Sequence, residues 1–483
     1  MAGDRQTSKV DAAIERLHAA ARSGDVGALL FEVEAKILVD PERILREAFS
    51  LLHELAPVPV TRAALARLAP LFPKTEAFQN DLGFLLHISG DPEGAAAAFG
   101  FSAERREERI ARHPLASTGL RIVHPAWLAG SFGEMAVRLN YFAKFRSLGM
   151  LPPWQVVLPA PQESIVNEPL LDLFAPYVNI VKSGDLLAKT QSLAADLALD
   201  LTCLPMADGR FLYVQDAFRA AEHAWAAAGR GPLLSLSPSR LSAGRACLAR
   251  IGLPADAWFV AMHVRDPAFH GEAQGRSRAD LAARDADVMT YLPAIERIVA
   301  RGGHVLRLGS NKAPALPGMP GFVDYAHSEV RSPELDLVAI AAARFMIATA
   351  SGPAHVSTAF GTPTIHTNAF PTNLHVAARD IWLPKIYRRR ADGRTLDLAE
   401  SLSAPFRGDL RGSGFGDYGI ELVANEPEDI AAACDEMLDR LDGRAPGDDS
   451  EVAGVFDRTG NLFIAPISAS YLARHRAVLL PGR

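Results

Sequence analysis

The sequence has few cysteines and no long hydrophobic run. Its 483 residues include three cysteines that lie far apart and form no C-x-x-C pair: Cys203, Cys247 and Cys434. This usage argues against a disulfide framework or a zinc site. The most apolar stretch, 335–350, is interrupted by Asp336 and Arg344, and the first residues lack the apolar segment of a secretory signal. We therefore expect no signal peptide and no membrane span, and a place in the cytoplasm.

An excess of charge of one sign is also missing. The chain has 50 Lys and Arg against 56 Asp and Glu, a formal net charge of −6. Nothing in this balance indicates a nucleic-acid backbone or an anionic lipid surface as the main partner. The content of 49% hydrophobic and 22% charged residues is that of a globular protein. At roughly 100–200 residues per domain, the length predicts two to four domains and rules out a lone small binding module.

The first part of the chain reads as helical throughout. From Asp11 to about Ala111, apolar residues recur at spacings of three and four, and alanine is frequent. Residues 80–99 resemble one helix pair of the tetratricopeptide type, although a solenoid needs about three such units. We predict that residues 1–112 form an all-helical region. It contacts either a partner protein or the rest of the chain, and a plain helical cap is the alternative.

The pattern changes near Leu120, where short apolar strands begin to alternate with helices. Strands are expected at 120–124, 154–159 and 177–181, and then, after Pro254, at 258–263, 304–308, 345–348 and 363–366. Such alternation is typical of parallel, doubly wound sheets. The sequence therefore predicts an α/β fold with two Rossmann-like domains, at 113–250 and 251–483, and a cleft between them.

In open parallel sheets, ligands bind beyond the carboxyl ends of the strands, so the residues after each strand are the ones to consider. Arg265 follows the buried strand 258–263, within the run His263-Val264-Arg265-Asp266. Its planar guanidinium can hold two phosphate oxygens at once. A structural contact of Arg265 with Asp266 or with a helix is the alternative.

A second loop combines small residues with a proline-initiated helix. It follows the strand 345–348 and contains Ser351, Gly352, Pro353, Ala354 and His355. Exposed backbone N–H groups and the positive end of the helix dipole would face an anion here. His355 could donate a hydrogen bond to the same anion. The alternative is an ordinary strand-to-helix connection with a buried histidine.

Two further patterns carry weaker signals. After the strand 304–308, Ser310 or Lys312 could contact a nucleotide, but a solvated turn explains them equally well. Asp285 and Asp287 have the D-x-D spacing of some metal-binding transferases. They also precede a helix, where capping and the helix dipole favour acidic residues. We expect no metal and no cofactor.

Five ordered patches together resemble a family of bacterial glycosyltransferases of the GT-B fold. They are 263–265, 284–295, 307–309, 324–328 and 351–353, and residues 467–472 are similar to the family's carboxyl-terminal pattern. The H-x-R element is similar to the donor-diphosphate motif of α-1,6-fucosyltransferases. The S-G-x-x-H spacing is similar to the donor loop of heptosyltransferases. This chain has Asp266 where the former have a second arginine, and Ala350 where the latter have an aspartate.

The resemblance implies metal-independent transfer of a sugar from a nucleotide-activated donor to a glycan, a lipid-linked glycan or a protein. His263, Arg265, the amides of 351–354 and His355 would bind the donor diphosphate. A base would come from the first Rossmann-like half, with Glu134 as the first candidate and His124 as the second. The resemblance also implies that a helix from about Ile467 crosses back onto that half. Peripheral attachment to the inner membrane is an alternative to a purely cytoplasmic location.

Two other functions fit the same observations. A nucleotide-sugar epimerase of the same architecture would turn over the donor without an acceptor. A noncatalytic scaffold would use its helical region to bind a partner and would keep only a vestigial nucleotide-sugar cleft.

Overall fold

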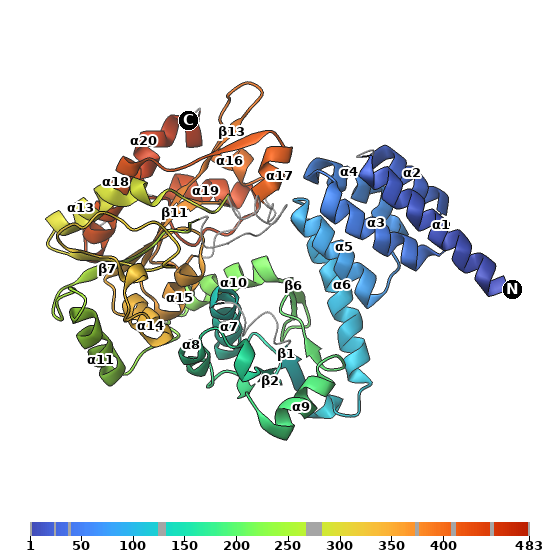
Figure 1. Ribbon diagram of the computed structural model, residues 1–483, viewed down its shortest axis with the longest axis horizontal. Helices are drawn as coiled ribbons and strands as arrows, with labels where there is room; N and C mark the ends of the chain where they lie inside the picture. The colour runs from blue at the N-terminus through green and yellow to red at the C-terminus, as the bar shows by residue number, and fades with distance from the viewer. Residues whose placement is uncertain are drawn as a thin grey trace.

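In a computed structural model, the chain forms an amino-terminal set of helices and two α/β parts, each built on a parallel sheet (Figure 1). The structure describes residues 2–23, 26–36, 40–123, 132–266, 283–371, 376–406, 412–444 and 449–481. Among these residues, no helix combines the length and the apolar character that crossing a membrane requires.

The amino-terminal region is helical, as predicted. Its helices are α1 (Ala2–Arg22), α2 (Val26–Lys36), α3 (Pro41–Leu55), α4 (Val58–Leu68), α5 (Glu76–Ile88) and α6 (Pro92–Ala111). Asp40 and Asp91 cap α3 and α6, each accepting a hydrogen bond from a backbone amide three residues on. The α5–α6 pair packs tightly because Gly83 has no side chain: a Cβ there would lie 2.8 Å from the Phe99 ring. The expected helix pair over 80–99 is confirmed, and its tetratricopeptide character stays a prediction.

The first sheet has four parallel strands in the order β3-β2-β1-β4. Its elements are β1 (Leu120–Val123), α7 (Phe132–Ser147), β2 (Gln155–Pro159), α8 (Glu168–Leu173), β3 (Asn179–Val181), α9 (Gly184–Leu193) and β4 (Ala198–Leu199). An antiparallel hairpin, β5 (Cys203–Pro205) and β6 (Phe211–Tyr213), then leads into α10 (Val214–Ala227). This hairpin packs against α6. The sequence did not predict it, because its strands are three residues long and lack a clear alternation.

The second sheet has six strands in the order β12-β11-β10-β7-β8-β9, all parallel. They are β7 (Phe259–His263), β8 (His304–Arg307), β9 (Phe322–Val323), β10 (Phe345–Ala348), β11 (Thr364–Ala369) and β12 (Ile381–Pro384). The strands β7 and β10 are apolar almost throughout because helices cover both faces of the sheet.

Most helices around this sheet begin with a proline in the first turn. They are α11 (Pro238–Ala249), α13 (Leu292–Ala300), α14 (Pro333–Ala341), α15 (Gly352–Phe360) and α18 (Pro427–Leu441), and α19 (Ser450–Arg458) follows without one. The Ser332 hydroxyl accepts a hydrogen bond from Leu335 N at 3.1 Å, with Pro333 in the first turn. A small antiparallel pair, β13 (Ile386–Arg389) and β14 (Ile420–Val423), and two short helices, α16 (Leu398–Ser401) and α17 (Gly412–Asp417), complete this half.

The two α/β halves share one hydrophobic cluster, in which α7 packs on α15 and α8 packs on α14. The carboxyl-terminal helix does not cross this junction as expected. Instead, α20 (Ala469–Leu479) packs on α18, and Tyr471 and Leu479 belong to the core of the second half. The position of α20 is fixed locally, since the Tyr471 hydroxyl donates to the carbonyl of Pro384 at 2.8 Å.

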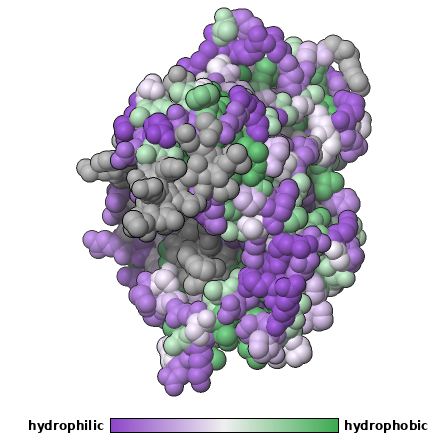
Figure 2. Space-filling model, turned by 90° about the vertical axis from the view of Figure 1, so that its right-hand side faces the viewer, coloured by the Kyte–Doolittle hydropathy of each residue, from purple (hydrophilic) through white to green (hydrophobic). Residues whose placement is uncertain are grey.

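The amino-terminal helices contact both halves. The Val58 amide donates to Asp417 in α17 at 2.8 Å, and Arg106 pairs with Asp200, just after β4, at 3.1 Å. Contact with the rest of the chain is therefore established, whereas a protein partner for these helices stays a prediction. Hydrophilic side chains dominate the face of the molecule shown in Figure 2.

Candidate functional site

The H-x-R element and the S-G-P-A-H loop lie side by side. The strands β7 and β10 that precede them are parallel neighbours, with His263 opposite Ala348. Beyond the strand ends, Arg265 N donates to the Thr349 hydroxyl at 3.0 Å, and Thr349 N donates to the His263 carbonyl at 3.2 Å. Two segments more than eighty residues apart therefore meet at one edge of the second sheet.

The start of α15 leaves polar groups without partners. Ser351 is the N-cap residue, with φ −150° and ψ 163°, but its side chain makes no capping hydrogen bond. The Ser351 hydroxyl is buried and has no hydrogen-bond partner in the part of the chain that the structure describes. The first-turn amides of any helix have no acceptor within that helix. This terminus therefore has the donors that an anion needs.

A second helix begins at the same place. A Cβ on Gly133, in the first turn of α7, would lie 3.0 Å from the Cα of Gly352 and 3.8 Å from the His355 ring. A Cβ on Gly352 would lie 3.1 Å from Gly133 N. The two glycines thus allow the helix starts to touch, which larger residues would prevent.

The two helices pack on one another along the junction of the two halves. Because they begin together at Gly133 and Gly352, their amino-terminal ends, which are the positive ends of the helix dipoles, lie close to each other.

Two cations with little exposure to solvent lie at the same edge of the sheet. The Arg265 side chain is 14% exposed, and its Nε lies 3.3 Å from an Asp285 oxygen. Burial, with a further contribution from Arg284, lowers the Arg265 pKa to about 10, against the opposing effect of Asp285. Lys385 follows β12 and donates to the Ala283 carbonyl at 2.6 Å. Burial lowers the Lys385 pKa to about 8, although Asp285 acts to raise it.

Positive side chains gather here. Arg265 and Lys385 both interact with the carboxylate of Asp285, and Arg284 interacts with Arg265. Asp285 serves as an ion-pair partner, and Asp287 caps the next turn by accepting from Met289 N at 2.9 Å. Both aspartates thus have structural partners.

His263 is a neutral group in this setting. Burial, and then the nearby Arg265 and Arg307, lower its pKa to about 4. Its Nδ1 is buried and lacks a hydrogen-bond partner among the described residues. As a neutral imidazole, His263 can donate or accept one hydrogen bond, but it adds no positive charge at neutral pH.

Glu134 comes directly after Gly133, at the meeting point of the two helices. Its carboxylate is 42% exposed and pairs with Arg138 at 2.5 Å, one turn further along α7. His124, the second candidate base, lies outside the described residues.

Ser310 and Lys312 lie elsewhere on the same edge. They follow β8, which flanks β7 on the side away from β10. Lys312 is exposed, and its amide donates to the Ser310 hydroxyl at 3.2 Å. A nucleotide contact by either residue stays a prediction.

Two site residues were missed from the sequence. Gly133 was not predicted, because nothing in the sequence shows which helix start it meets. Lys385 follows the apolar run Ile381-Trp382-Leu383, so the rule that pointed to Arg265 would have found it had this run been recognised as a strand.

No protein-family model matches the sequence, and no curated protein matches it. Several solved glycosyltransferases are similar in structure. The heptosyltransferase II of E. coli that acts with ADP-heptose on LPS is 12% identical, with a TM-score of 0.34 over 60% of this chain and 95% of that one. A family 9 glycosyl transferase from Veillonella parvula is 12% identical, with a TM-score of 0.32 over 55% and 85%. An O-GlcNAc transferase mutant of Thermobaculum terrenum is 12% identical, with a TM-score of 0.22 over 94% and 97%. At such TM-scores these likenesses decide neither the fold nor the activity.

Proposed function

We propose that this protein is a glycosyltransferase that moves a sugar from a nucleoside-diphosphate donor to an acceptor hydroxyl. The supporting observation is the convergence of α7, α15 and the cations Arg265 and Lys385 on one edge of the second sheet. Charge that is largely removed from water is costly unless it is compensated. A diphosphate would bring negative charge to these cations and to the helix ends.

Within this proposal, the second half holds the donor. The diphosphate of the donor accepts hydrogen bonds from the first-turn amides of α15 and from the Ser351 hydroxyl, and it pairs with the Arg265 guanidinium. Pro353 has no amide hydrogen, so Gly352, Ala354 and His355 supply the backbone donors. His355 lies in the same first turn and can add its ring nitrogen.

The reaction needs stabilisation of the leaving group. The oxygen of the acceptor hydroxyl attacks the anomeric carbon, and the bond from that carbon to the phosphate oxygen breaks. The nucleoside diphosphate leaves with the electron pair, and the hydroxyl proton passes to the Glu134 carboxylate. Hydrogen-bond donors that are already in position around the departing phosphate stabilise its developing negative charge, which is usually the largest single contribution to catalysis. Because protein cations and helix ends face the developing charge, we propose that no metal is needed.

A binding panel tests this assignment. Thermal shift and calorimetry with UDP-, GDP- and ADP-sugars should identify one nucleotide class that stabilises the protein, whereas CMP-sugars, which carry a single phosphate, should not. A ligand at about 100 times its dissociation constant should add about 2.7 kcal/mol. Arg265→Ala should abolish that shift. Arg388→Ala is the matched control, since it removes an exposed arginine paired with Glu421 at 3.5 Å.

Three results would contradict the proposal. One is the absence of any nucleotide-dependent shift. Another is an equal shift with the nucleoside alone, which would leave the phosphate site without a role. The third is turnover of the donor to an isomeric sugar nucleotide without an acceptor, which would indicate an epimerase.

A further inference from the structure

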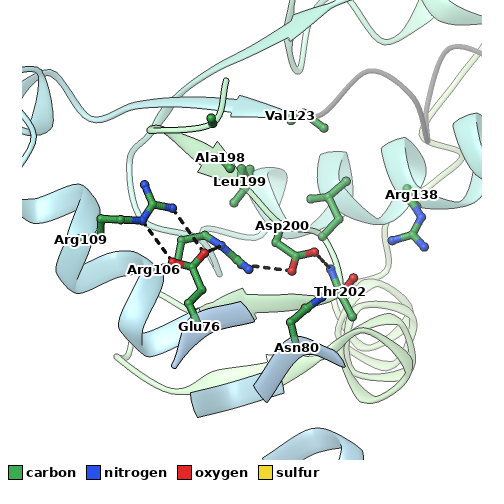
Figure 3. Close-up of a pocket in the computed structure, with 12 residues that line it drawn as sticks. Glu76, Asn80, Arg106, Arg109, Val123, Arg138, Ala198, Leu199, Asp200 and Thr202 are labelled. Atoms are coloured by element: carbon green, nitrogen blue, oxygen red, sulfur yellow. Dashed lines mark hydrogen bonds and ion pairs between the residues drawn. The ribbon is translucent and has the colours of Figure 1, made fainter. Parts of the chain in front are cut away.

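A separate cavity of about 340 Å³ lies between the amino-terminal helices and the first sheet (Figure 3). Its size is within the range of about 300–1,000 Å³ that is usual for small-molecule sites. One wall is the carboxyl edge of the first sheet, with Val123 at the end of β1 and Leu199 at the end of β4. The opposite wall comes from α5 and α6. The cavity is therefore at the edge of a parallel sheet where ligands bind, and the helical region closes it.

Charged groups in this cavity are paired with one another. Arg106 contacts Glu76 at 2.9 Å and Asp200 at 3.1 Å. Arg109 contacts Glu76 at 3.1 Å, and its guanidinium also donates to the carbonyl of Asp196 at 2.9 Å. Figure 3 shows these side chains as a continuous chain across the cavity. The lining is thus rich in fixed donors and acceptors but nearly balanced in charge.

Two uncharged polar side chains complete the lining. Asn80, from α5, and Thr202, after β4, have no hydrogen-bond partner for their side chains within the described ranges. Figure 3 shows them near Asp200, with Val123, Ala198 and Leu199 on the sheet side. A ligand here would meet amide, hydroxyl and charged planar groups over a small apolar surface.

The geometry points to a binding site for a glycosyl unit of the acceptor. Sugar hydroxyls both donate and accept hydrogen bonds, so they suit a lining of paired guanidinium and carboxylate groups. The C–H face of a sugar ring suits the apolar floor. A free phosphate suits the cavity less well, because Glu76 and Asp200 already occupy the guanidinium groups.

The position of the cavity supports the same assignment. Arg138 lines it from α7 and pairs with Glu134, which adjoins the helix junction at Gly133 and Gly352. Arg138 thus connects the cavity to the proposed base through one ion pair. Calling the ligand an acceptor rests on the proposed transferase activity, but the binding of a sugar here does not.

Saturation-transfer NMR on the full chain tests the site. The probes are free hexoses, N-acetylhexosamines and hexuronic acids at millimolar concentration. Asn80→Trp fills the cavity and should lower the affinity of the bound sugar by at least about tenfold. Ala77→Trp is the matched control, since Ala77 is exposed on the same helix and does not line the cavity. If Asn80→Trp fails to fold, Thr202→Val, which removes only a hydroxyl, should still weaken sugar binding several-fold.

The outcomes separate this inference from the proposed function. Asn80→Trp should keep the nucleotide-sugar thermal shift, because the donor binds at the other sheet. No signal from any sugar, equal signals in wild type and Asn80→Trp, or protection by inorganic phosphate alone would overturn the inference while leaving the donor assignment intact. If the wild-type protein binds a sugar but shows no thermal shift with any nucleotide sugar, only the proposed transferase activity is overturned.

Discussion

The carboxyl edges of the two parallel sheets differ in how their charges are compensated. At the second sheet, Arg265 and Lys385 both interact with Asp285, Arg284 interacts with Arg265, and two helix starts add positive ends. At the first sheet, the arginines have carboxylate partners. An edge where positive groups gather suits an anion, whereas an edge with paired charges suits a neutral ligand rich in hydroxyl groups. On this comparison we propose that the donor binds at one edge and the acceptor at the other.

The largest effect should follow from removing charge at the positive edge. Arg265→Ala should lower kcat/KM for transfer by about 10²–10³-fold, the usual loss for one donor to a developing negative charge. Steady-state kinetics with the identified donor would measure this, with Arg388→Ala as the control. Retained turnover with a normal fold would contradict the assignment.

Glu134 lies between the two edges, so it should affect chemistry more than binding. Glu134→Gln should lower kcat by about 10²-fold or more while donor affinity stays within about twofold. Glu163→Gln, at an exposed position in the same half, is the control. An unchanged kcat would remove Glu134 as the base.

The depressed pKa of Lys385, about 8, makes a prediction about pH. In the free protein, the Lys385 ammonium group loses its proton as pH rises through 8. In the complex, the bound anion keeps Lys385 protonated. Donor affinity should therefore be flat below pH ~7 and fall by up to about tenfold per pH unit above pH ~8. Lys385→Arg keeps a permanent charge, so calorimetry from acid to alkaline pH should show that the slope is gone. A slope that persists in this variant would contradict the role of Lys385.

The junction of the two helix starts should be sensitive to one methyl group. Gly352→Ala would place a Cβ 3.1 Å from Gly133 N, so the helix starts must separate. Donor affinity should fall by about 3–10-fold, measured by calorimetry. Gly416→Ala is the control, because its Cβ would meet nothing within 4 Å. Equal donor affinity in the two variants would show that the close approach has no role in binding.

Salt should produce the smallest effects and should separate the two edges. Between ~50 and ~500 mM salt, donor binding should weaken several-fold, because salt screens the attraction between the charged diphosphate and the protein cations. Sugar binding at the first edge should change by less than about twofold. Titrations at both salt concentrations measure this, and equal salt dependence would remove the distinction between the edges.

Local chemistry made much of the fold predictable. The apolar run 258–263 forms β7, and Pro353 lies in the first turn of α15, both as expected. These features depend on neighbours in sequence. The strand rule likewise brought Arg265 and Ser351 to one edge, because parallel neighbours end together.

Features that depend on distant contacts could not be predicted. The approach of Gly133 to Gly352 joins residues from two halves of the chain, and the cavity at Asn80 and Thr202 joins the helical region to a two-residue strand. The packing of α20 on α18 also depends on tertiary contacts, and the family resemblance predicted a different position for this helix.

A crystal structure with the bound nucleoside diphosphate would test the central claim most directly. The account predicts phosphate oxygens about 2.7–3.2 Å from the amides of Gly352 or Ala354 and from the Arg265 guanidinium. A nucleotide bound elsewhere, with Arg265 still held only by protein groups, would contradict it.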